Sequence, residues 1–145
     1  MAAPTYTWKF VYDLYGNRVP KVVTLEATAN LETKVGTLVI MNSGQVDEAT
    51  ATAVAIIGIA AEATSAAATA ADPIKVYVIA PGMVIRGTAD ADASALQGFT
   101  SKLMDVNTDG SLDVADAAGG GLSVYRVNNA AGTEVDCLIT LGALV

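Results

Sequence analysis

The sequence contains no histidine and only one cysteine, Cys137. Without these residues the chain cannot assemble a Ser-His-Asp triad, a Cys-His pair or a common zinc site. Phosphate-binding loops of the types G-x-x-x-x-G-K-[ST] and G-x-G-x-x-G are also missing. We therefore predict that the protein is not an enzyme and that it uses no cofactor and no metal.

Nothing in the sequence indicates classical secretion or a fold that depends on disulfides. A lone cysteine cannot form an intrachain disulfide, and the apolar neighbours of Cys137 indicate a small buried hydrophobic residue. The first ten residues interleave polar and apolar side chains, unlike a signal peptide.

Charged residues are scarce and basic residues are scattered. Charged side chains make up 16% of the chain, against about 25% in an average soluble domain, and the net charge is −7. The eight Lys and Arg residues are spread from Lys9 to Arg126 without a cluster, so we expect no nucleic acid partner.

The chain is also rich in apolar residues, which make up 52% of it. The most apolar run, Val54 to Ala61, is interrupted by Gly58 and is much shorter than the roughly 20 residues of a membrane-spanning helix. We therefore expect no membrane partner, and we expect apolar surface to be covered by partner subunits instead.

The acidic residues do not form a recognisable catalytic motif. We expect six of them to be solvated charges on the surface, because charged side chains are seldom buried unless they are paired. These six are Glu26, Glu32, Asp47, Glu48, Glu62 and Glu134.

Short runs of β-branched and aromatic residues, separated by Gly, Pro and Asn, predict a mainly β chain folded as a small β-barrel or sandwich. The stretch from Ala60 to Asp72 is predicted to be a loop. The predicted strands are Thr5–Asp13, Val19–Leu25, Gly36–Met41, Gln45–Glu48, Ile56–Ile59, Ile74–Ile79, Met83–Arg86, Phe99–Val106, Ser111–Val114, Leu122–Val127 and Val135–Leu141.

Turn residues indicate how some of these strands are joined. Gly16-Asn17 predicts a hairpin between the first two strands, and Pro20 places the second of them at a sheet edge or a bulge. Asn42-Ser-Gly44 and Pro81-Gly82 predict two further tight turns. We expect residues 1–30 to form an N-terminal strand or hairpin arm and residues 31–145 to form the main β domain.

Aromatic residues are concentrated at the start of the chain, where five of the eight lie between Tyr6 and Tyr15. Alternation places Tyr6, Trp8, Phe10 and Tyr12 on one face of a strand. These four rings either fill one end of the core or form a partner-binding strand, and aromatic side chains are common in both settings. We take them as the candidate partner-binding residues.

One segment matches the pattern of a calcium-binding loop. Oxygen-bearing side chains stand at its positions 1, 3, 5, 9 and 12, and Gly110 stands at position 6. A hairpin with the turn Asn107-Thr-Asp-Gly110 explains the same residues, and we predict that calcium is not required for folding. The five candidate ligands are Asp105, Asn107, Asp109, Asp113 and Asp116.

Three segments together resemble the head decoration, or cement, proteins of tailed bacteriophages. They are Val35-Gly-Thr-Leu-Val-Ile-Met-Asn-Ser-Gly-Gln-Val-Asp-Glu-Ala, Ile57-Gly-Ile-Ala-Ala-Glu and Ile74-Lys-Val-Tyr-Val-Ile-Ala-Pro-Gly-Met-Val-Ile-Arg-Gly, about the middle third of the chain. The similarity is carried by glycines and β-branched residues and includes no catalytic signature.

The resemblance implies a small β-barrel or β-tulip-like fold on the outer surface of a virion capsid. Such a protein is often a homotrimer at local symmetry axes, where it clamps neighbouring major capsid protein subunits and stiffens the shell. A calcium-stabilised extracellular binding module is the alternative function, and the sequence indicates no secretion route for it.

Overall fold

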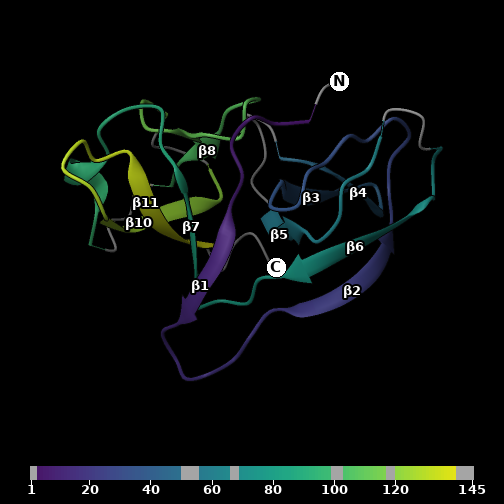
Figure 1. Cartoon of the computed structure of the whole chain (residues 1–145), viewed down its shortest axis with the longest axis horizontal. Helices are drawn as coiled ribbons and strands as arrows, with labels where there is room; N and C mark the ends of the chain where they lie inside the picture. The colour runs from purple at the N-terminus through teal and green to yellow at the C-terminus, as the bar shows by residue number, and fades with distance from the viewer. Residues whose placement is uncertain (1–2, 50–55, 66–68, 99–102, 117–119, 140–145) are drawn as a thin grey trace.

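A computed structural model describes residues 3–49, 56–65, 69–98, 103–116 and 120–139 (Figure 1). Within these ranges the chain is mainly β, as predicted, with antiparallel strands and a single 3-10 turn, η1 (Ser94–Leu96). The strands form two open sheets and one short hairpin, and no closed barrel is found among the described residues.

The first sheet has four strands and the second has five. In spatial order, the first sheet contains β1 (Lys9–Asp13), β7 (Met83–Thr88), β11 (Glu134–Ile139) and β10 (Leu122–Val127). The second contains β2 (Lys21–Glu26), β6 (Pro73–Val78), β5 (Ile56–Ala60), β3 (Leu38–Asn42) and β4 (Gln45–Glu48). The short hairpin pairs β8 (Asp105–Val106) with β9 (Leu112–Asp113).

Two predicted turns are confirmed. Ser43 and Gly44 both have positive φ, +51° and +85°, which fits the tight turn that joins β3 to β4. Pro81 and Gly82 join β6 to β7, and the Met83 amide donates to the Ala80 carbonyl at 3.0 Å. Because β6 and β7 belong to different sheets, this second turn carries the chain from one sheet to the other.

The predicted hairpin at Gly16-Asn17 is wrong. β1 pairs with β7 in the first sheet, whereas β2 pairs with β6 in the second. The chain does reverse locally, with a bridge between Asp13 and Gly16, but the two strands then diverge into different sheets. β2 is an edge strand, as Pro20 predicted, and residues 3–30 thus contribute one strand to each sheet.

Several other predictions fall partly outside the described residues. No helix is found in the described parts of the stretch from Ala60 to Asp72, which supports the predicted loop there, and residues 66–68 are not described. Residues 99–102 of one predicted strand and 140–141 of another also lie outside the described ranges.

The main core lies between the two sheets. Ile56 and Ile59 of the second sheet pack in one cluster with Ile85 and Cys137 of the first. Cys137 is fully buried and burial raises the pKa of its thiol, which confirms the predicted small hydrophobic role. A second cluster, including Val39, Val46, Ile74 and Val76, buries apolar residues of the second sheet separately.

Candidate functional site

Two of the four predicted partner-binding aromatics face the core. Trp8 is 3% exposed, and its indole Nε1 donates a hydrogen bond to the Gly110 carbonyl at 2.8 Å. The ring lies so close to Gly87 that a side chain at that position would overlap it. Phe10 is half-buried and packs on the same cluster. These two rings therefore stabilise the fold.

Tyr12 lies on the opposite face of the first sheet from Phe10, so the predicted alternation is wrong at this point. The register of β1 against β7 shifts between the two residues, with Phe10 opposite Ile85 and Tyr12 opposite Val84. This β-bulge inserts Val11 as an extra residue. The side chains after it therefore point to the opposite face of the sheet from the one that strict alternation predicts. The rings of Tyr12 and Tyr125 pack edge-on with their centroids 6.4 Å apart, and the Arg126 guanidinium lies 5.7 Å from the centroid of the Tyr12 ring.

Tyr6 is the most exposed of the four rings, at 40%. Its backbone amide donates to the Asp109 carbonyl at 2.8 Å, which fixes the segment that precedes β1 against the β8–β9 hairpin. Contact of the four aromatics with a partner stays a prediction. Of the four, Tyr6 has the largest exposed fraction.

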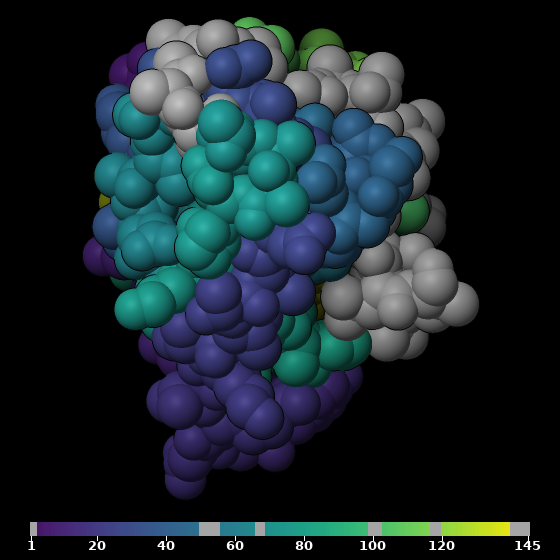
Figure 2. All heavy atoms as spheres, turned by 90° about the vertical axis from the view of Figure 1, so that its right-hand side faces the viewer, coloured from purple at the N-terminus to yellow at the C-terminus, as the bar shows by residue number. Residues whose placement is uncertain are grey.

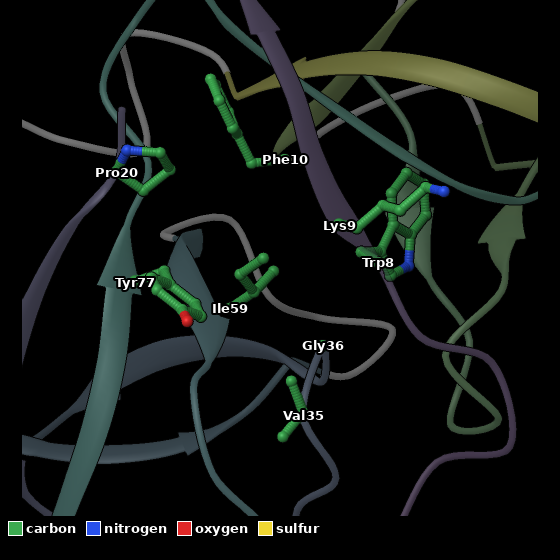
Figure 3. Close-up of a pocket in the computed structure, with 8 residues that line it drawn as sticks. All are labelled: Trp8, Lys9, Phe10, Pro20, Val35, Gly36, Ile59 and Tyr77. Atoms are coloured by element: carbon green, nitrogen blue, oxygen red, sulfur yellow. The ribbon is translucent and has the colours of Figure 1, made fainter. Parts of the chain in front are cut away.

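An apolar groove of about 270 Å³ lies between β1 and the second sheet. Figure 3 shows Phe10, Pro20, Ile59 and Tyr77 around a common space, with Val35 at one side. Val35 is 60% exposed, so apolar surface continues from the groove to the outside of the molecule. A groove with this lining favours an apolar side chain over a charged ligand.

A braced loop, residues 13–19, joins β1 to β2 and protrudes from the body of the molecule, as Figures 1 and 2 show. Arg18 forms a two-pronged ion pair with Asp13, with nitrogen to oxygen distances of 2.7 and 2.9 Å, and it also donates to the Pro81 carbonyl at 2.8 Å. The hydrogen bond from Arg18 is the largest effect that lowers the pKa of Asp13 to about 2. The loop is thus held to the turn between β6 and β7 and to itself.

The braced loop presents two apolar side chains to solvent. Tyr15 is 78% exposed and Val19 is 73% exposed, the largest values among the large hydrophobic residues that the structure describes. The ring of Tyr15 lies against Gly82, and the Arg18 guanidinium is 6.0 Å from its centroid. The sequence predicts only a tight turn for this segment. Asp13 and Arg18 flanking a Gly-Asn pair are the signal that would have identified an internally paired loop.

A hollow of about 580 Å³ adjoins the braced loop. It is lined by residues of the loop itself, Asn17, Arg18 and Val19, and by Val78 and Met83 among others. The braced loop and this hollow thus lie together beside the edge strand β2, and the apolar groove lies between β1 and the second sheet.

The candidate calcium loop folds as the predicted hairpin. The Asn107 side chain donates to Asp90 and to Ser111, and the Asp109 carboxylate accepts from the amide of Ser111 at 2.9 Å. Asp105 is instead buried beside Asp116. Its pKa is raised to about 6, chiefly by burial and then by the hydrogen bond and charge of Asp116.

The five candidate calcium ligands thus do not converge on one point. Across the described ranges, no group of three or more acidic, histidine or cysteine side chains is placed to hold a metal ion. That calcium is not required for folding stays a prediction.

The most deeply buried carboxylate has a structural role. Asp136 is 0% exposed and accepts hydrogen bonds from Arg86 at 2.7 Å, Asn128 at 2.9 Å and Arg126 at 3.1 Å. Burial acts to raise its pKa, but the three donors together outweigh burial and leave the pKa lowered. Its acceptor capacity is used within the fold, so this network braces the first sheet.

No helix in the described part of the chain is long and apolar enough to span a membrane. Comparison of the sequence with models of known protein families finds no match, and comparison with curated proteins finds none either.

Proposed function

We propose that this chain is a non-enzymatic structural protein that adheres to another protein, and specifically a capsid decoration (cement) protein on the outer surface of a bacteriophage head. Its partner would be the major capsid protein, and its own assembly a homotrimer. The observation that carries the proposal is the braced loop, which presents Tyr15 and Val19 beside two hollows with apolar linings.

A rigid, exposed aromatic side chain is well suited to contact with another protein. Tyr offers a large contact area and loses little conformational entropy on binding, and Tyr and Arg are both enriched among the residues that dominate interface energies. The ion pair between Asp13 and Arg18 orders the loop in advance. Pre-ordering removes part of the entropic cost of association.

Composition supports the same function. With 52% hydrophobic and 16% charged residues, much of the surface must be uncharged. Interface cores are depleted in charge, and a coat formed by many copies would cover such surface. The segments that resemble decoration proteins include β3, β4, β6 and β7, which belong to both sheets. The β-tulip-like form implied by that resemblance stays a proposal.

The test is the location of the protein in purified virions of the phage that encodes it. We expect it at a fixed molar ratio to the major capsid protein and accessible to antibody on intact particles. Absence from purified particles, or presence only after the particles are opened, would overturn the proposal. Sedimentation of the isolated protein tests the trimer separately.

A further inference from the structure

Glu48, at the end of β4, is a buried carboxylate. It is 4% exposed, and neither of its carboxylate oxygens has a hydrogen-bond partner among the residues that the structure describes. The prediction that Glu48 is a solvated surface charge is therefore wrong. Along β4 the side chains of Val46 and Glu48 share one face, and Glu48 lies opposite Val39 of β3. Both valines belong to the second hydrophobic cluster, so this carboxylate stands beside an apolar core.

Such a position is costly to maintain. A buried carboxylate with no hydrogen bond loses its hydration without replacement, and an apolar side chain at the same place would avoid that cost. A buried polar group without a hydrogen bond calls for an explanation in a native structure. A ligand that supplies the missing hydrogen-bond partner would explain the presence of Glu48.

The surroundings of Glu48 form an acidic pocket of about 410 Å³. Its lining includes Asn30, Glu32, Asn42, Asp47 and Glu48, and no Lys or Arg of the described ranges is part of it. None of the three carboxylates belongs to an ion pair among the described residues.

The charges around Glu48 are unbalanced. Burial raises its pKa most, the charges of Asp47 and Glu32 raise it further, and the positive charge of the amino terminus acts in the opposite direction. The pocket therefore has an excess of negative charge and unused hydrogen-bond acceptors.

We propose that the acidic pocket of Glu32, Asp47 and Glu48 binds the guanidinium or ammonium group of an Arg or Lys side chain from the partner protein. These groups carry only donors and one positive charge, which complements the two Glu48 oxygens that lack donors among the described residues. A metal ion fits less well, because Asp47 already accepts from the Asn42 side chain at 3.2 Å and from the Glu48 amide at 2.9 Å. The identity of the partner rests on the proposed function, but the pocket's preference for a cation does not.

The pocket can be tested without any capsid. Butylguanidinium and butylammonium chloride are titrated into the full protein, and the side-chain carboxyl ¹³C resonances of Glu32, Asp47 and Glu48 are followed by NMR. Asp47 lines the same pocket and reports binding in the variants that lack Glu32 or Glu48. We expect a saturable shift with either cation and none with butanol. Binding should weaken about tenfold in Glu48→Gln and about threefold in Glu32→Gln. It should be unchanged in Glu26→Gln, which removes one negative charge from an exposed position of β2.

Unfolding by urea separates binding from stability. Glu48→Gln should leave the protein as stable as the wild type or more stable, because an unpaired buried charge is removed. If Glu48→Gln fails to fold, Glu32→Gln still tests the pocket. Three results would overturn the proposal: no saturable shift with either cation, a shift produced by calcium at lower concentration than by the amines, or a shift produced by acetylation of the amino terminus and not by the cations.

The proposed pocket and the proposed function can fail independently of each other. If both cations shift Glu48 but the protein does not occur on virions, the pocket stands and the proposed function fails. If the protein decorates virions but no cation shifts Glu48, the proposed function stands and the pocket fails.

Discussion

The indole of Trp8 donates a hydrogen bond to the carbonyl of Gly110, 102 residues later in the chain. This bond connects the residue before β1 to the turn of the β8–β9 hairpin, while the indole ring packs over Gly87 of β7. A side chain that the sequence predicts as a partner contact thus joins three distant segments of the fold.

Replacement of Trp8 should act on folding first. We expect Trp8→Ala to lower the free energy of unfolding by about 3–5 kcal/mol, because a buried aromatic ring is lost. Trp8→Phe should lower it less than Trp8→Ala, since it retains most of the apolar ring but leaves the Gly110 carbonyl without its donor. Urea unfolding of both variants gives the two values. A Trp8→Ala protein as stable as the wild type would contradict the assignment of this ring to the core.

The buried carboxyl of Asp105 should make stability depend on pH. Its folded pKa of about 6 lies above the ordinary value of 3.8, so between these values the folded state holds a proton that the unfolded state releases. The contribution of Asp105 to the free energy of unfolding is therefore fully present below about pH 4. It is lost as the pH rises through about 6, which lowers the free energy of unfolding by about 1 kcal/mol.

Unfolding midpoints of the wild type and Asp105→Asn, compared across this range, isolate that contribution. The difference between the two proteins should move in favour of the asparagine variant as the pH rises. A difference that stays constant from about pH 4 to pH 7 would show that Asp105 titrates normally.

Calcium should have no effect on folding. The side chains of Asn107 and Asp109 are already used within the hairpin, so binding a cation would require breaking those hydrogen bonds. Thermal unfolding in calcium and in chelator should give the same midpoint. Since a ligand that binds only the native state raises its stability, a calcium-dependent rise in the midpoint would refute this expectation.

Tyr15→Ala should separate adhesion from folding. Because the ring is 78% exposed, its removal should change the free energy of unfolding by no more than about 0.5 kcal/mol. Binding to the partner should weaken by about 2 kcal/mol, or roughly thirtyfold, if the ring is an interface anchor. Tyr6→Ala is measured beside it, since it truncates a second exposed tyrosine, which is itself a candidate contact outside the braced loop. Equal losses of binding in both variants would argue against a special role for the braced loop.

Local chemistry made much of the fold predictable. The β3–β4 hairpin follows from Ser43 and Gly44, which can adopt positive φ in a tight turn between two apolar runs. The turn at Pro81-Gly82 follows equally from its own residues. In both cases the structure-determining interactions lie within a few residues of one another.

Features set by distant contacts could not be predicted. Gly16-Asn17 suits a hairpin, but β1 and β2 pair with β7 and β6, whose paired residues lie at least 47 positions away in the sequence. The bulge at Val11 depends on the register against β7, so alternation alone placed Tyr12 on the wrong face. The burial of Glu48 depends likewise on the segments packed around the end of β4, which no local pattern reveals.

The most direct measurement of the central claim is rebinding of the purified protein to capsids from which it has been stripped. Adhesion to a repeating surface predicts saturable binding at a fixed ratio to the major capsid protein, together with weaker binding of Tyr15→Ala at unchanged stability. Failure of the folded wild-type protein to bind stripped capsids, or binding that never saturates, would contradict the claim that this chain is a capsid decoration protein.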